Sequence, residues 1–216
     1  MAIFAIIGLG SFGTTVATEL MKLEHDVIGI DINKRYVENI ANNITHAVIA
    51  DATDEHVLEE LNIQNCDAVI VAIGEDIEAS VLCVLNLKNL GVKRIWGKAK
   101  TKSHHTILSH LHIEKIIHPE EDMGIRVAQA LNYPMVSRYM ALNDDHYIIQ
   151  IPIPENFHRE TLNRFLAKSP LVKPLLIKRL THIFYQIEPD ITLASGDILI
   201  LEGPLPQLKK VCELFI

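Results

Sequence analysis

The sequence predicts an α/β protein, with a Rossmann-like doubly wound parallel sheet followed by a smaller α+β module. Short apolar runs alternate with segments of helical spacing up to about residue 118, which is typical of parallel strands joined by crossover helices. A glycine-rich turn, Gly8 to Gly13, follows the first apolar run. Beyond residue 143 the strand-like segments are separated by turn residues and no longer alternate with long helices, which favours an α+β arrangement there.

The first half of the sheet is expected to contain three strands and three helices. Each strand corresponds to a short apolar run, and the ranges are 3–7, 27–30 and 47–50. Apolar residues recur along one side of 14–23, which indicates a helix there. Further helices are expected at 35–42 and at 54–61, where Asp54 is a suitable N-cap.

The same pattern then starts again. Strands are expected at 68–73, 94–99 and 115–118, and helices at 77–90 and 103–111. Gly91 follows the longer helix in the position where glycine commonly ends a helix. Two halves of three strands each predict the strand order 3-2-1-4-5-6.

The remainder is expected to begin with a helix from Glu120 to about Tyr139, bent or ended by Pro134. Strands follow at 147–153, 171–179, 183–188 and 198–201, with a turn at 194–197 before the last of them. A closing helix is expected at 205–214.

The glycine run predicts a phosphate-binding turn because it follows a strand and opens a helix. Gly8 permits a tight turn, Gly10 lets the backbone approach a phosphate, and Gly13 lets helix and strand pack closely. Ser11 and Phe12 complete the run. The free N–H groups and dipole of the first helical turn favour an anion. The alternative is a plain strand–helix turn without a ligand.

Acidic residues at the ends of the next strands point to the rest of a nucleotide. Asp31, ending the second strand, can accept hydrogen bonds from both ribose hydroxyls and disfavours NADP. Asp51, Ala52 and Thr53 follow the third strand and border the adenine end of the crevice. Gly74 and Glu75 follow the fourth strand, across the point where the strand order reverses.

Composition excludes several other classes of protein. The formal net charge of −7 argues against nucleic acid as a partner. The three cysteines are widely spaced and are expected to be reduced thiols. With no signal peptide and no membrane-length apolar stretch, a cytoplasmic protein is expected. The histidine-rich run His104, His105, His110 and His112 is expected to form a solvated helix face and not a metal site.

An NAD-dependent oxidoreductase is the alternative function, since it would use the same glycine loop and Asp31. However, no acid–base constellation accompanies the nucleotide site in the sequence. A nucleotide sensor that acts without a channel partner is a third possibility.

Taken together, several segments resemble the regulatory subunits of Trk/Ktr potassium uptake systems, which are RCK-domain proteins of the TrkA/KtrA type. The segments are Gly8 to Gly13, Asp31, Asp51 to Asp54, Val71 to Asp76 and His118 to Glu120. The resemblance covers the whole chain. It implies an RCK N-terminal nucleotide-binding domain at 1–118, a crossover and dimerisation helix at 119–140, and an RCK C-terminal domain at 141–216.

The resemblance implies a regulatory protein and not an enzyme. Such subunits form homodimers that assemble into an octameric ring beneath a membrane-embedded potassium-translocating subunit. ATP, ADP or NAD(H) binds the N-terminal domains, and ligand exchange changes the ring conformation. Some members also bind cyclic di-AMP through the C-terminal domain, where this chain has Lys173 in place of a frequent asparagine.

The resemblance also adds site residues. Lys98 matches a lysine that faces the phosphates, and Glu120 matches a glutamate that can hold Mg²⁺ or Ca²⁺. The alternative for Glu120, Glu121 and Asp122 is that they are first-turn acids that complement a helix dipole. Relatives often have arginine where this chain has Ser11 and Glu121, which leaves ADP and NAD(H) open beside ATP.

Overall fold

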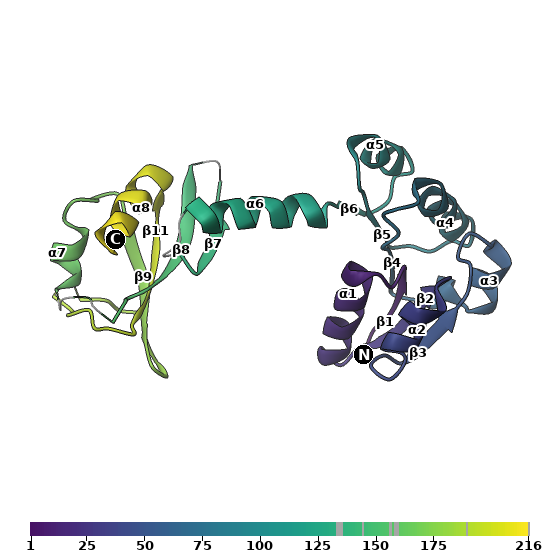
Figure 1. The fold of residues 1–216 in the computed structure, drawn as a ribbon, viewed down its shortest axis with the longest axis horizontal. Helices are drawn as coiled ribbons and strands as arrows, with labels where there is room; N and C mark the ends of the chain where they lie inside the picture. Colours follow the sequence, from purple (N-terminus) through teal and green to yellow (C-terminus); the bar gives the residue numbers. More distant parts are fainter. Residues whose placement is uncertain (133–135, 144, 156, 158–159, 189, 216) are drawn as a thin grey trace. The chain divides into compact units, whose positions relative to one another are not determined.

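The computed structural model describes residues 1–216 except 133–135, 144, 156, 158–159, 189 and 216. The chain divides into two units, Met1–Asp122 and Met123–Ile216. Figure 1 labels the helices and strands of both.

The first unit is built on a six-stranded parallel sheet. Its strands are β1 (Ile3–Ile7), β2 (Asp26–Asp31), β3 (His46–Ile49), β4 (Ala68–Val71), β5 (Ile95–Lys98) and β6 (Lys115–Ile117). They pair in the order β3-β2-β1-β4-β5-β6. The doubly wound order expected from the sequence is therefore confirmed. All six carboxyl ends lie at the same edge, which is where such sheets bind ligands.

Helices cover both faces of this sheet (Figure 1). The helices are α1 (Ser11–Lys22), α2 (Lys34–Ile40), α3 (Glu55–Glu60), α4 (Ile77–Asn89) and α5 (Lys102–His110), with a 3-10 turn at Ile63–Asn65. Buried residues of α1 and α2 form one hydrophobic cluster with β1 and β2. Buried residues of α3, α4 and α5 form a second cluster on the other face.

The second unit contains a five-stranded antiparallel sheet. Its elements are the strands β7 (Arg138–Ala141), β8 (His146–Pro152), β9 (Lys173–Arg179), β10 (His182–Phe184) and β11 (Ile198–Pro204), and the helices α7 (Leu162–Leu166) and α8 (Leu205–Cys212). The order is β10-β9-β11-β8-β7. One core cluster joins α7 and α8 to the inward residues of β8, β9 and β11.

The helix between the sheets is shorter than the sequence predicted. α6 spans Pro119–Asn132, and the expectation that it continues to about Tyr139 is wrong. Residues 138–141 instead form β7, paired with β8. Tyr139 contributes to the core of this unit beside Tyr147, at 4.8 Å between ring centroids, so tertiary packing outweighs the local helical pattern. Pro134 lies outside the described residues.

Two smaller differences also lie in the second unit. The strand expected at 183–188 ends at Phe184. The short helix α7 was not predicted, and its two buried residues, Leu162 and Phe165, are too few to show a helical repeat.

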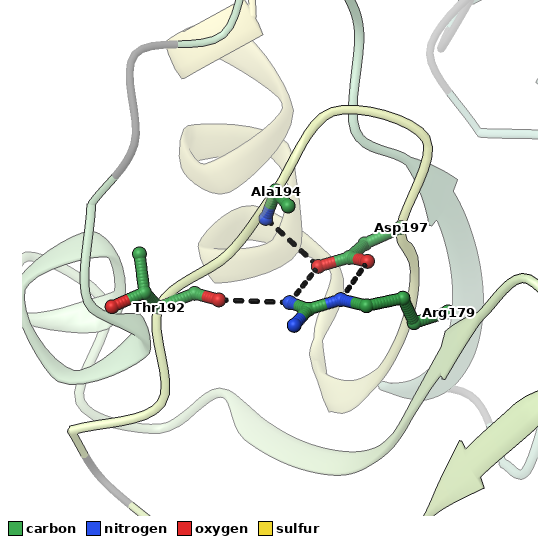
Figure 2. Close-up of polar contacts among 4 residues, drawn as sticks. All are labelled: Arg179, Thr192, Ala194 and Asp197. Carbon is green, nitrogen blue, oxygen red and sulfur yellow. Dashed lines mark hydrogen bonds and ion pairs between the residues drawn. The ribbon is translucent and has the colours of Figure 1, made fainter.

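An ion pair with a buried carboxylate holds β9 to the turn before β11 (Figure 2). Arg179 donates from Nε and Nη2 to the two carboxylate oxygens of Asp197, at 2.7 Å each. Asp197 also accepts from the Ala194 N–H at 2.8 Å, and Arg179 donates to the Thr192 carbonyl at 2.9 Å. Asp197 is 1% exposed. Arg179 and the turn therefore supply the hydrogen bonds of this buried carboxylate.

Candidate nucleotide-binding site

The glycine turn after β1 is shaped by two close approaches. Gly8 has a φ of +97°, in the left-handed region that disfavours residues with a Cβ. At Gly13, a Cβ would lie 1.9 Å from the carbonyl oxygen of Gly8. The strand–turn–helix passage is therefore possible only because both positions lack a side chain.

Gly10 differs from the other two glycines. A Cβ at Gly10 would meet no protein atom within 4 Å, and its φ of −64° is accessible to any residue. Gly10 is the N-cap of α1, and no side chain caps this helix. The protein itself therefore gives no reason for glycine at this position, whereas an anion close to the first turn of α1 would give one.

Asp31, at the end of β2, is hydrogen-bonded to the glycine turn. One carboxylate oxygen accepts from the Leu9 N–H at 2.6 Å, and the other accepts from the Asn33 N–H at 2.7 Å. A carboxylate has about four acceptor positions, so two remain for ribose hydroxyls. Asp31 thus positions the turn as well as offering acceptors.

The segment after β3 is organised by Asp51. Its Oδ1 accepts from the N–H and the hydroxyl of Thr53, at 2.9 and 2.7 Å. These hydrogen bonds from Thr53 hold the pKa of the Asp51 carboxyl below its ordinary value. Asn86 of α4 donates to the Thr53 carbonyl at 2.7 Å, and Ala52 is buried. The Asp51–Thr53 turn is therefore hydrogen-bonded to α4, the helix that follows β4 on the other side of the point where the strand order reverses.

Lys98, at the end of β5, supplies the positive charge. Its Nζ would lie 3.0 Å from a Cβ at Gly74, and it lies 6.0 Å from the centroid of the Phe12 ring. The Lys98 side chain is 12% exposed, and Nζ lies 2.6 Å from Glu120 Oε1. Four predicted residues from four segments, Phe12, Gly74, Lys98 and Glu120, therefore come together at the carboxyl edge of the sheet.

Glu120 and Glu75 are both paired with lysines. The hydrogen bond from Lys98 is the largest cause that lowers the pKa of the Glu120 carboxyl, and Lys100 lowers it further by its charge. Lys100 is itself in contact with Glu75. Ser11 is exposed in the first turn of α1. Lys100 was not predicted from the sequence, although its place two residues beyond Lys98 could have indicated it.

The predicted residues thus share one edge of the sheet. Asp31 and Asp51–Thr53 lie on the β2–β3 side, and Gly74, Lys98 and Glu120 lie on the β4–β6 side, with the glycine turn after β1 between them. Among the described residues, no group of three His, Cys, Asp or Glu side chains could hold a metal ion. The role of Glu120 as a ligand of Mg²⁺ or Ca²⁺ stays a prediction.

The expectation of a solvated histidine face is wrong for His104. This side chain is fully buried. Its Nδ1 lies 3.4 Å from the Lys100 N–H, and its Nε2 lies 3.2 Å from Ser80 Oγ. An acceptor role for Nδ1 assigns the proton to Nε2, which then donates to Ser80. His104 links the start of α4 to the segment that carries Lys98 and Lys100.

We expect His104 to make the fold sensitive to mild acid. Burial lowers the pKa of His104 from its ordinary value of 6.5, and the charge of His118 adds to this. The unfolded chain therefore binds a proton near pH 6.5 that the folded chain does not, so stability falls as pH drops below about 6.5. Urea unfolding at pH 7.5, 6.5 and 5.5 measures the effect. His104→Gln should be less stable at pH 7.5 but should lose less on acidification; an equal loss in both proteins would contradict this assignment.

No helix among the described residues is long and apolar enough to cross a membrane.

Comparison with known proteins gives matches along the whole chain. Residues 4–119 match the TrkA-N domain family. The chain is 36% identical over 208 residues to Ktr system potassium uptake protein A of Bacillus subtilis (strain 168), covering 96% of this chain and 94% of that protein. It is 34% identical over 206 residues to the protein of the same name from Vibrio alginolyticus, covering 95% and 94%.

A solved structure shares the fold at low identity. The crystal structure of the GsuK RCK domain superposes with a TM-score of 0.63 at 14% identity, covering 99% of this chain. This chain spans 47% of the length of that solved chain. A structure of the GsuK channel bound to NAD gives a TM-score of 0.58 over 99% of this chain and 39% of the channel chain. The RCK fold expected for both units is therefore confirmed.

Proposed function

This chain belongs to the TrkA-N domain family, and we propose that it is the regulatory subunit of a potassium uptake system that senses an adenine nucleotide. The observation that carries the proposal is the match of 36% over 208 residues to a Ktr potassium uptake protein, which spans both units. Both relatives named above are potassium uptake proteins, so we set aside the oxidoreductase alternative.

The geometry supports a nucleotide ligand in the first unit. Gly10 leaves open space at the uncapped start of α1, which suits a phosphate. Asp31 keeps free acceptor positions for a ribose, and Lys98 provides a nearly buried cation at the far end of the crevice. We assign the adenine edge to Asp51, Ala52 and Thr53, and the phosphate end to Ser11, Phe12, Gly74, Glu75 and Lys98. ADP, ATP and NAD(H) all meet these requirements.

Assembly is the second part of the proposal. In α6, Met123, Val127 and Leu131 are spaced by four residues and are 56%, 50% and 78% exposed. An exposed apolar stripe of this kind suits a contact with a second copy of the chain. We propose a homodimer through α6, further assembly into a ring, and a membrane-embedded potassium-translocating partner at the inner face of the membrane.

A divalent cation fits this site only together with a ligand. Mg²⁺ is usually bound by one or two carboxylates together with phosphate oxygens, and Glu120 is a carboxylate that lies beside Lys98 at the phosphate end. We propose Glu120 as its protein ligand when a nucleotide supplies the other oxygens.

Ligand screening tests the proposal. With ATP, ADP, NAD⁺ or NADH at about a hundred times its dissociation constant, thermal unfolding of the full chain should shift upward by about 5 °C or more. Cyclic di-AMP belongs in the same screen. Asp31→Ala should lose the shift caused by the adenine nucleotide.

The unliganded melting temperature of Asp31→Ala must be measured as well, because Asp31 also holds Leu9 and Asn33. No shift with any adenine nucleotide would refute the nucleotide site. Co-purification with a potassium-translocating membrane protein separates a transporter subunit from a sensor that acts alone.

A further inference from the structure

Lys98, the cation at the phosphate end, already forms an ion pair with a carboxylate. Lys98 Nζ lies 2.6 Å from Glu120 Oε1, while the side chain of Lys98 is only 12% exposed. The end of this lysine lies against Gly74, and the Phe12 ring lies 6.0 Å away. Lys98 is therefore held in one place by β5, the segment after β4 and the first turn of α1.

We propose that Glu120 is an internal competitor for the nucleotide's phosphate. In the ligand-free state its carboxylate takes the position at Lys98 that a phosphate oxygen takes on binding. The inference deepens the proposed function and rests on it, because Lys98 must face the phosphate for the competition to occur.

The two partners of this ion pair differ in their freedom to move. The Glu120 side chain is 68% exposed, so it can turn into water, whereas Lys98 at 12% cannot. Carboxylate and phosphate oxygens are both anionic acceptors for an ammonium group. A phosphate that arrives at Lys98 without a divalent cation therefore displaces Glu120, and the lysine stays in place.

A second pair lies beside the first. Lys100 contacts Glu75, whose side chain is 89% exposed. Lys98 and Lys100 thus each form an ion pair with a glutamate before a ligand arrives. A phosphate that binds either lysine must replace its ion pair. A ligand that brings more negative charge to Lys98 displaces Glu120 more readily, which makes Glu120 a residue that selects ligands by phosphate charge.

Displacement of Glu120 also acts on the start of α6. Glu120 belongs to the first turn of this helix, which begins at Pro119. Besides the ion pair, His105 Nδ1 and His118 Nε2 lie 2.8 Å apart, and the Asp122 N–H donates to the His118 carbonyl at 2.9 Å. The ion pair thus attaches the first turn of α6 to the end of β5. A bound phosphate removes this contact.

The test measures ADP affinity by calorimetry, with the full chain in a buffer that contains a metal chelator. Glu120→Gln keeps the shape of the side chain but removes its charge, and we expect it to bind ADP about threefold to tenfold more tightly than the natural chain. Glu19→Gln is the matched control, because Glu19 forms an exposed ion pair of the same length, 2.6 Å, with Lys22 in the last turn of α1, away from the site. It should change the affinity by less than about twofold. Lys98→Met should weaken binding by more than about tenfold, and in the Lys98→Met background Glu120→Gln should bring no gain.

The possible outcomes distinguish the competitor role of Glu120 from the existence of the nucleotide site. Equal or weaker binding by Glu120→Gln, with the natural chain binding ADP, would overturn the competitor and leave the nucleotide site intact. A gain that persists in Lys98→Met would show that Glu120 acts through general repulsion, which also overturns it. If neither the natural chain nor Glu120→Gln binds ADP, ATP or NAD⁺, both the competitor and the nucleotide site are wrong.

Discussion

Arg179→Met is expected to destabilise the second unit by about 3–5 kcal/mol, because it leaves a buried carboxylate without its cation. Asp197 is 1% exposed and would keep the hydrogen bond from the Ala194 N–H (Figure 2). The reverse change, Asp197→Asn, should cost less, since the side chain of Arg179 is 38% exposed and can reach water. Urea unfolding, with hydrogen exchange of β9 and β11 to identify the unit, measures the loss.

The acid dependence of this pair gives a second measurement. Burial opposes ionisation of Asp197, but the hydrogen bonds from Arg179 and Ala194 outweigh it and hold the pKa of the carboxyl below its ordinary value of 3.8. The pair therefore stabilises the fold above about pH 4 and is lost as pH falls through the lowered pKa. In Arg179→Met the penalty should shrink on acidification, because protonation removes the uncompensated charge.

A matched control lies in the same unit. Arg164 and Glu160 form an ion pair at 3.2 Å, with Arg164 82% exposed. Arg164→Met should cost less than about 1 kcal/mol. If the two arginine variants lose similar stability, burial of Asp197 does not determine the strength of its ion pair.

The first unit was predictable because its signals are local and repeated. Each strand of the parallel sheet is a short apolar run, and Asn33, Asp54, Asp76 and Thr101 cap the following helices. Gly8, Gly13 and Asp31 were expected at the carboxyl edge of the sheet and lie there. Their meeting follows from strand order alone, since parallel strands place successive loop residues at one edge.

The strands of the second unit and the partners of the charged side chains were harder to predict from the sequence. Residues 138–141 continue an apolar pattern compatible with a helix, and only pairing with β8 makes them a strand. His104 lies in a polar segment, and its partner Ser80 belongs to a helix 24 residues earlier in the chain, so local pattern could not indicate its burial. Lys98 and Glu120 were each expected at the site, but nothing in their spacing indicated that they pair with each other.

Gly13→Ala and Gly10→Ala are expected to separate folding from ligand binding. A Cβ at Gly13 would lie 1.9 Å from the Gly8 carbonyl oxygen, so β1 and α1 must move apart. We expect a loss of about 3 kcal/mol or more, or no folded protein. A Cβ at Gly10 meets nothing within 4 Å and keeps an accessible φ of −64°. Gly10→Ala should therefore change stability by less than about 1 kcal/mol.

Although Gly10→Ala should fold normally, it should bind the nucleotide poorly. The methyl group of Gly10→Ala would occupy the open space at the start of α1, where a phosphate must come close to the backbone. We expect this folded variant to bind ADP more than about tenfold more weakly than the natural chain, by calorimetry at equal protein concentration. Because its unliganded melting curve should match that of the natural chain, lost affinity cannot be attributed to unfolding. Normal ADP affinity in Gly10→Ala would place the phosphates away from α1 and leave Lys98 as the main phosphate contact.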